Sequence, residues 1–561
     1  MTAQPRGVVT ASAPRRVGPW LWLLSFLAFV AVAHGNFETT DAGLTMYAAK
    51  NLLDRGDSGF RTAEQGASAP AEMAAARALR SGISGRVGAG DLAYTWFPIG
   101  HVWLFVPVVA AGDALAPAWP APEGHFQQQL AREPDFAALS AIQGAPVLTQ
   151  GLYSLLVPAA FAATTVLLLF HLARVLGSGV RAAAGSALAI VFATQAFALG
   201  REQLSDGPGL TFLVGALLAI VAVHQQRGSR HTSFVGGLCA GAAALLRYQN
   251  IALLLLAGVT LLLACRRQRR WQDLAAFVVG TLPAMGLFFA ANEARFGSIL
   301  DTGYPKTDEW LTHPLGLGVL KILFGAGRGV AWFSPLVWLV LPLALRRAQV
   351  PQLRWLGLSL FLFPLLFFAR ALGWDGGQCW GARYVTHGLV VWLAIVLPQA
   401  APWRRWPKTF WLLLGLGLCV NVTSVVAPTR GVQQLGGQAA AALGLVPDLG
   451  DAHDALSSQP RFSPLLANWR YAAVAWRGGF EDEAGRVRRD GSAVSAVFGV
   501  TGTSLLQRLA PVRWEDRGGR HLWWRFWGDL FSIAGIWLLL PVLGALVWCA
   551  RRTLVALGGT R

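Results

Sequence analysis

Long apolar runs separated by short polar segments dominate this chain. A helix needs about 20 mostly apolar residues to cross a bilayer, and twelve stretches come close to that length. One run, 233–265, is divided by the polar break Arg247-Tyr248-Gln249-Asn250 into two short helices. The pattern predicts an all-α polytopic membrane protein with about twelve transmembrane helices, over residues 18–34, 147–173, 182–200, 207–224, 233–246, 249–265, 274–292, 330–345, 355–371, 384–400, 409–426 and 528–550.

Composition supports a membrane protein rather than a soluble one. Of the 561 residues, 54% are hydrophobic and only 14% are charged, whereas soluble proteins are about 25% charged. The net charge of +18 comes from short basic clusters between apolar runs, not from a basic soluble domain, which argues against nucleic-acid binding. The five cysteines form no C-x-x-C pair and the ten histidines no H-E-x-x-H motif, so neither a disulfide framework nor a metal site is indicated.

The distribution of charge orients the predicted helices. With a cytoplasmic N-terminus, the cytoplasmic segments contain 20 of the 47 basic residues and, among the 29 acids, only Asp273. This asymmetry follows the positive-inside rule and places both termini in the cytoplasm. Residues 97–112 are apolar but short, and a span there would put the cluster 266–270 outside. We therefore expect them to lie in the outer membrane interface.

This topology divides the chain into three parts. Residues 1–426 form a membrane module with a large first outer loop at about 35–146, residues 427–527 form a second outer loop, and residues 528–561 supply the last helix and a cytoplasmic tail. Transporters and proton pumps usually carry ionisable residues at mid-span, and these spans have essentially none. The acids instead cluster at the outer helix ends and loops, which places the working site at the outer membrane surface.

Asp41 is the leading candidate for chemistry. It follows the first span directly and stands at the head of a helix expected over 42–55, in which Leu44, Ala48 and Leu52 repeat on one face. Such an amphipathic helix can lie on a membrane. Two interpretations are open at this point. Asp41 either caps this helix or acts as a general base toward a hydroxyl acceptor.

Several motifs, taken in order, resemble the GT-C superfamily of membrane glycosyltransferases over about residues 18–400. The similarity is to the bacterial protein-mannosyltransferase-like branch, which includes lipid A aminoarabinose and galacturonic acid transferases. In that branch the acid that follows a Ser in the second outer loop is usually Glu followed directly by Pro, whereas this chain has Asp206-Gly207-Pro208. The motifs are the outer Asp41 followed by YAAKNLLDRGD (47–57), FPIGH (97–101), REQLSDGP (201–208), LLRY (245–248), FGS (296–298) with Gly303-Tyr304, GAGRGVAWFSP (325–335) and WGARY (380–384).

The resemblance implies a GT-C-like fold with interfacial helices in the first periplasmic loop. It implies transfer of a hexosyl or pentosyl unit from a polyprenyl-phosphate sugar to a hydroxyl of an envelope glycolipid, polysaccharide or protein. The reaction would occur at the periplasmic face of the bacterial inner membrane. Beyond the bilayer and the lipid-linked sugar, the partner is an unknown acceptor, and no nucleic acid is implied. No cofactor is required by the motifs, and a divalent cation is left open.

The same resemblance suggests roles for individual residues. Asp41 would be the catalytic base, with Glu38 as the second choice. Arginine would bind the leaving phosphate, because its planar fork forms bidentate hydrogen bonds. An arginine that begins a span can equally be a snorkelling interface residue, and the glycines around residue 328 also fit a tight turn. The candidates for the phosphate are Arg383 with Tyr384, Arg328 and Arg247; those for the acceptor or a cation are Asp206, Glu202 and His101.

Three other classes of function stay open. A polymerase or ligase of lipid-linked saccharides fits the large late outer loop. A transporter fits the polar break at 247–250, and a non-catalytic membrane protein fits the fold alone. The sugar, the acceptor and the lipid length are not encoded in any motif found.

Overall fold

The structure is a computed structural model in which α-helices predominate. Its only sheet among the described residues is a small hairpin, in which β1 (Gly85–Val87) pairs antiparallel with β2 (Ala93–Thr95). The described residues are 13–37, 39–67, 69–82, 84–131, 146–304, 310–345, 351–374, 376–377, 379–445, 456, 459–477, 479–480, 492–498 and 520–558.

The α-helices of the described residues are α1 (Ala13–Ala31), α2 (Thr40–Arg55), α3 (Pro70–Arg80), α4 (Ile99–Leu115), α5 (Pro120–Ala131), α7 (Val147–Val175), α8 (Val180–Phe192), α9 (Asp206–His224), α10 (Arg230–Leu246), α11 (Gln249–Gln268), α12 (Trp271–Phe296), α14 (Leu315–Phe324), α15 (Val330–Phe333), α16 (Val337–Leu345), α17 (Pro351–Ala369), α18 (Thr386–Ala400), α19 (Pro402–Arg405), α20 (Pro407–Val426), α21 (Thr429–Ala442), α23 (Pro464–Trp476), α24 (Ser492–Phe498), α25 (Trp523–Leu530) and α26 (Ile536–Gly558). Short 3₁₀ helices occur at Ala63–Gln65, Ala89–Asp91, Ala116–Ala118, Gln195–Gly200, Arg383–Val385 and Pro460–Phe462.

The all-α membrane class is supported, but the count of twelve spans is not confirmed. Seven helices of the described residues are long and apolar enough to cross a membrane. Six of them are predicted spans, and the seventh is α4 with the short turn that follows it, which the sequence placed in the interface. Several other predicted spans are shorter helices in the structure. The seven are Ile99–Ala118, Val147–Val175, Asp206–His224, Gln249–Gln268, Trp271–Phe296, Pro407–Val426 and Ile536–Gly558.

Three predicted spans have different bounds in the structure. The predicted span 182–200 is wrong in its second half, because α8 ends at Phe192 and the Thr194 hydroxyl caps a separate 3₁₀ helix. The predicted span 330–345 is two helices, since the chain breaks around Pro335 between α15 and α16. The predicted span 528–550 is shifted, because α25 ends at Leu530 and the long helix begins only at Ile536.

Two helices of unequal length frame the site. α10 and α12 begin side by side, where the Arg270 guanidinium donates to the Gly228 carbonyl at 2.7 Å and Ser233 donates to Asp273 at 3.4 Å. Small residues let them approach, as a Cβ on Gly237 would lie 2.0 Å from the Phe277 carbonyl oxygen. α10 has 17 residues and α12 has 26. At 1.5 Å per residue, α12 therefore extends about 13 Å beyond the end of α10.

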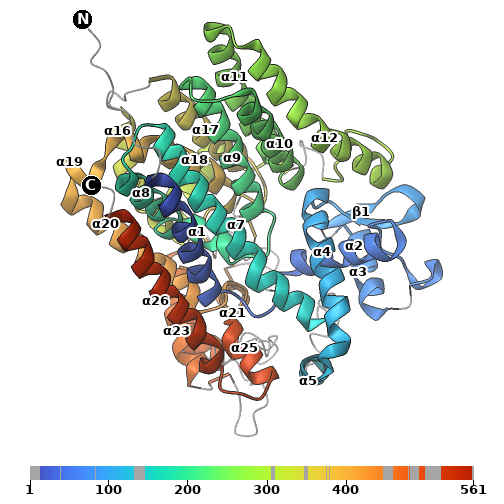
Figure 1. Cartoon of the computed structure of the whole chain (residues 1–561). Helices are drawn as coiled ribbons and strands as arrows, with labels where there is room; N and C mark the ends of the chain where they lie inside the picture. The colour runs from blue at the N-terminus through green and yellow to red at the C-terminus, as the bar shows by residue number, and fades with distance from the viewer. Residues whose placement is uncertain are drawn as a thin grey trace, which may run out of the picture.

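The segment that the sequence predicts to be the first outer loop packs against this extension of α12. Arg295, near the end of α12, donates to the Phe97 carbonyl at 3.2 Å. Helices α2, α3 and α4 and the hairpin share a core that includes Phe37, Phe60 and Phe105. In Figure 1 these blue elements gather at one end of the bundle, beside α7 and α12.

The C-terminal part returns to the start of the chain. α26 lies along α1, with Trp548 edge-to-face against Trp20 at 5.0 Å between centroids, and the two helices run together in Figure 1. α25 packs on α5 through Phe526 and Phe126. The described parts of the predicted second outer loop, in α21, α23 and α24, have an apolar core of their own.

Candidate active site

An ion cluster centred on Asp206 joins three separate parts of the chain. Asp206 is the first residue of α9 and is fully buried. Its Oδ1 lies 2.9 Å from Arg247 Nη2, and its Oδ2 lies 2.8 Å from Arg383 Nη2 and 2.9 Å from Arg383 Nε. Buried charges need such partners, because an uncompensated one is strongly unfavourable. With two guanidinium groups and one carboxylate, this cluster keeps a net charge of +1.

His387 and Asn250 fix the backbone beneath this cluster. His387 Nε2 bonds the Asp206 carbonyl at 2.9 Å, and its Nδ1 lies 2.8 Å from Asn250 Oδ1. Both side chains are fully buried, and Asn250 also donates to the Ala243 carbonyl at 2.9 Å. The starts of α9, α11 and α18 are thereby held together. A buried polar network of this kind restrains the elements that it joins.

The loop before α18 positions Arg383. The Gln195 side chain forms two hydrogen bonds with the backbone of Ala382. Its Oε1 accepts from Ala382 N at 3.1 Å, and its Nε2 donates to the Ala382 carbonyl at 3.0 Å. Gly381 has a φ of +69°, and a Cβ there would lie 2.7 Å from Gln195 Oε1. Glycine therefore suits this position on both grounds. These contacts fix the backbone from which the Arg383 side chain extends.

Asp41 does not cap α2. The cap is Thr39, whose hydroxyl oxygen accepts from Ala42 N at 3.3 Å, while Asp41 lies in the first turn and offers its carbonyl to the Thr45 hydroxyl. The capping interpretation of Asp41 is thus wrong. Asp41 is half-buried, and its carboxylate has no hydrogen bond or ion pair with any described residue. An acid in the first turn is also favoured by the helix dipole.

The Asp41 carboxyl lies within the electric field of the ion cluster. Burial raises the pKa of Asp41 above its ordinary value. The positive charges of Arg383 and Arg247 oppose this shift, and the negative charge of Asp206 adds to it. A free carboxylate with a raised pKa is a better proton acceptor than an ordinary aspartate. The structure therefore brings together the base and two of the three arginines that the sequence predicted.

Aromatic rings line the same region. The Arg247 and Arg383 guanidinium groups lie 5.8 Å and 5.9 Å from the Tyr384 ring centroid, and this ring stacks on Phe368 at 4.4 Å. Contacts of this kind between cations and rings hold arginine planes in place. Tyr384 thus lies beside the predicted phosphate-binding residues.

Tyr304 is a site residue to which the sequence assigned no role. It interacts electrostatically with Arg247, Arg383 and Asp41, so it lies near all three. Its ring is 40% exposed and stacks on Trp96 with 5.8 Å between centroids. The sequence offered only one signal, the Gly303-Tyr304 pair within a motif of the resemblance.

The remaining predicted residues support the site without joining its ion cluster. Arg328 is buried and donates to the Cys379 carbonyl at 3.3 Å, which ties it to the loop before Arg383. Glu202 Oε1 accepts from Trp380 N at 3.1 Å, so it does not pair with Asp206 as a second acid. His101 is buried and bonds the Tyr153 hydroxyl at 3.0 Å. Glu38 lies outside the described residues.

Both acids proposed for a cation have protein partners in this arrangement. The Asp206 carboxylate is engaged by the two arginines and Glu202 by a backbone amide. Within the described ranges, no group of three or more His, Cys, Asp or Glu side chains could hold a metal ion. The positive charge described at this site is that of arginine.

Comparison with known protein families covers part of this site. The sequence model of the dolichyl-phosphate-mannose-protein mannosyltransferase family matches residues 148–291, from α7 to α12, a range that contains Asp206 and Arg247. The match supports a GT-C membrane glycosyltransferase. Asp41 and Arg383 lie outside the matched range, so within the GT-C interpretation they are assigned by their place beside Asp206 and Arg247. No curated protein and no solved structure matches the chain.

Proposed function

We propose that this protein transfers a sugar from a polyprenyl-phosphate donor to a hydroxyl of an envelope acceptor, with Asp41 as the general base. One observation carries the proposal. The Asp41 carboxylate has no described partner and lies in the field of two arginines that meet at Asp206. The reaction would take place at the periplasmic face of a bacterial inner membrane, in the membrane module of residues 1–426.

The proposed step is a displacement at the anomeric carbon of the sugar. The acceptor oxygen attacks this carbon and its proton passes to the Asp41 carboxylate. The bond between the anomeric carbon and the phosphate oxygen breaks, and its electron pair leaves with the lipid phosphate. General base catalysis of this kind typically contributes about 10²–10⁴-fold to the rate.

Arg247 and Arg383 would bind the leaving phosphate. A sugar phosphodiester carries one negative charge, and the phosphate gains a second as the sugar departs. The net charge of +1 in the ion cluster favours this change. Among the described residues, Arg383 Nη1 has only a long 3.4 Å bond to the Gly376 carbonyl, and Arg247 Nη2 only a 3.5 Å bond to Gln249 besides its ion pair. The two groups thus keep donor capacity for a phosphate.

Asp41→Asn tests this proposal directly. The substitution keeps the size of the side chain and leaves the Thr39 cap intact, so the fold should be unchanged. Purified protein should lose about 10²–10⁴-fold in sugar transfer from a polyprenyl-phosphate donor, with an unchanged melting temperature. Asp54→Asn is the matched control, because Asp54 lies on the same helix and is exposed.

The outcome separates the proposed activity from the alternatives. A fully active Asp41→Asn protein would remove Asp41 as the base and direct the test to Glu38. A single sugar added per acceptor identifies a transferase, whereas a ladder of products identifies a polymerase of lipid-linked saccharides. No product with any lipid-linked sugar, together with solute uptake into vesicles, would favour a transporter.

A further inference from the structure

A groove opens at the end of the bundle opposite the ion cluster. α11 begins beside His387 at Asn250 and runs away from the site, so Arg266 lies 16 residues further on, about 24 Å along the helix. α17 runs the other way, because its last turn reaches Tyr384 through Phe368. The groove between these two helices has a volume of about 770 Å³. It is therefore independent of the proposed active site.

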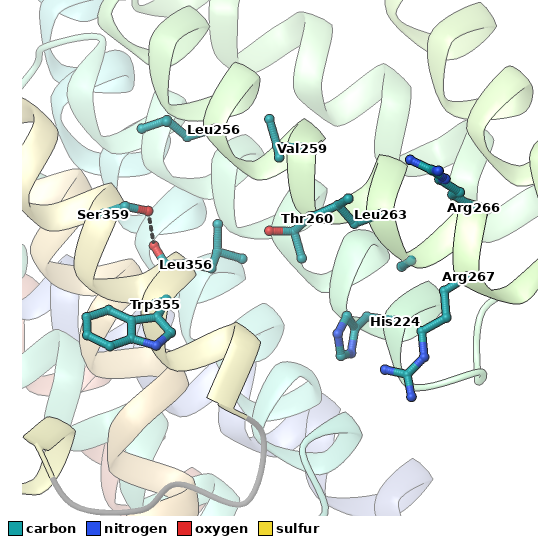
Figure 2. Close-up of a pocket in the computed structure, with 11 residues that line it drawn as sticks. His224, Leu256, Val259, Thr260, Leu263, Arg266, Arg267, Trp355, Leu356 and Ser359 are labelled. Carbon is teal, nitrogen blue, oxygen red and sulfur yellow. Dashed lines mark hydrogen bonds between the residues drawn. The ribbon is translucent and has the colours of Figure 1, made fainter.

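The walls of the groove are mainly apolar. Leu256, Val259 and Leu263 of α11 face Trp355 and Leu356 of α17, as Figure 2 shows. Val259 is 54% exposed and Leu263 is 58% exposed, so these side chains are not covered by the chain itself. The Ser359 hydroxyl is engaged by the Leu356 carbonyl of its own helix. In a bilayer the occupant of such a groove must be apolar along its length.

The end of the groove is positively charged. Arg266 and Arg267 line it at the last turn of α11, next to His224 at the end of α9 (Figure 2). Both arginines are exposed, and neither forms an ion pair with a described residue. Trp355, 58% exposed near the start of α17, has the position of an interfacial anchor. An occupant with a negatively charged end would complement this charge.

The depth of the groove matches one leaflet. From Leu256 to Arg266 there are ten residues of helix, about 15 Å. Half of a hydrocarbon core of about 30 Å has the same depth. A phospholipid with its phosphate at the arginines would place an acyl chain along the apolar walls. A polyprenyl chain longer than one leaflet would extend beyond them.

We propose that the groove between α11 and α17 binds an anionic phospholipid, with its phosphate at Arg266 and Arg267 and an acyl chain along Val259 and Leu263. Each basic residue near a lipid surface contributes about fivefold in affinity. Loss of both arginines should therefore weaken binding by about 25-fold. A zwitterionic lipid with the same chains should bind more weakly than the anionic one.

Native mass spectrometry of the full chain tests this site. The protein is titrated with phosphatidylglycerol and with phosphatidylcholine of identical acyl chains. Arg266→Gln/Arg267→Gln should reduce affinity for phosphatidylglycerol about 25-fold, to the level of phosphatidylcholine. Arg266→Lys/Arg267→Lys should retain most of it. Arg404→Gln/Arg405→Gln is the matched control, because this exposed pair follows α18 and does not line the groove.

A second variant tests the apolar part of the groove. Val259→Trp fills it from an exposed position and should displace the acyl chain, weakening phosphatidylglycerol binding without unfolding the protein. Equal affinity for the two lipids, or equal loss in the control pair, would overturn the proposal. So would unchanged binding in Val259→Trp, or tight binding of a polyprenyl phosphate in place of phosphatidylglycerol.

Discussion

The Asp206 carboxylate engages Arg383 through two guanidinium nitrogens, with Nε at 2.9 Å and Nη2 at 2.8 Å from the same oxygen. A lysine has one point charge and cannot reproduce this planar contact. The geometry of the pair therefore sets the direction in which the rest of the Arg383 guanidinium points.

Arg383→Lys should weaken use of the lipid-linked donor. A charged hydrogen bond contributes about 1.5–3 kcal/mol, so kcat/KM should fall by roughly 10- to 150-fold. Steady-state transfer assays at several donor concentrations measure this loss. Arg370→Lys is the control, since Arg370 is exposed and its side chain donates, among the described residues, to the Leu311 carbonyl. Wild-type kinetics in Arg383→Lys would mean that Arg383 only anchors the loop.

Asp206→Asn should destabilise the protein strongly. It leaves two buried guanidinium groups without their counter-ion, and breaking a buried pair costs about 3–5 kcal/mol. Denaturant or thermal unfolding in detergent measures the loss. The double variant Asp206→Asn/Arg247→Gln should be less destabilised than the sum of the two single variants, because the charges are coupled. Strict additivity would contradict the ion cluster described above.

The pH dependence of transfer should report the raised pKa of Asp41. A general base works only when deprotonated, so activity should fall as pH drops through a pKa above the ordinary 3.8. Arg383→Gln removes a positive charge that lowers this pKa, so the acidic limb should move to higher pH. Arg370→Gln should leave it in place. A limb that stays at its wild-type pH in Arg383→Gln would separate Asp41 from the ion cluster.

Gly209→Ala should disturb Arg247 most, and Asn250 to a lesser degree, because the added Cβ would lie 3.3 Å from Asn250 Nδ2. A Cβ at this position would lie 2.9 Å from Arg247 Cγ, so the arginine has to shift away from Asp206. We expect reduced transfer with the helix retained. Gly258→Ala on α11 is the matched control, because nothing lies within 4 Å of its Cβ. It should keep full activity and match or exceed wild-type stability by up to about 1 kcal/mol.

Reporter fusions should establish the orientation of the bundle. Fusions at Arg267 and Arg405 should report the cytoplasm, and a fusion near Asp91 should report the periplasm. The sequence also predicts a periplasmic report near Asp482, which lies outside the described residues. An outer signal at Arg267 would show that α4 crosses the membrane, and the basic groove would then face the periplasm.

Much of the site was predictable because its residues stand at helix ends. Arg247 follows an apolar run and Arg383 precedes one, so the sequence placed both at the membrane boundary. What it could not give was the pairing through Asp206, since the three residues are far apart in the chain and meet only through packing. The cap of α2 was missed for a local reason: Thr39 and Asp41 are both good capping residues, and only backbone geometry distinguishes them.

The fold was less predictable where an apolar run is long enough to span a membrane but the chain changes direction within it. The run 182–200 is mostly apolar, yet Thr194 and Gln195 redirect the chain after Phe192 into contact with Ala382 and Ser334. Hydropathy does not register such hydrogen bonds. Hydropathy also does not register the break around Pro335, which divides the predicted span 330–345 into two helices.

The unequal lengths of α10 and α12 relate the position of the ion cluster to the thickness of the membrane. With Arg247 about 13 Å short of the end of α12, the ion cluster is set at a fixed depth below the top of the longer helix. Under the proposed function, hydrophobic mismatch becomes a variable of the reaction, because a thicker bilayer would raise the phosphate of the lipid-linked donor relative to this depth and a thinner one would lower it. Bilayer thickness would thereby tune how well the donor phosphate and the arginines are in register.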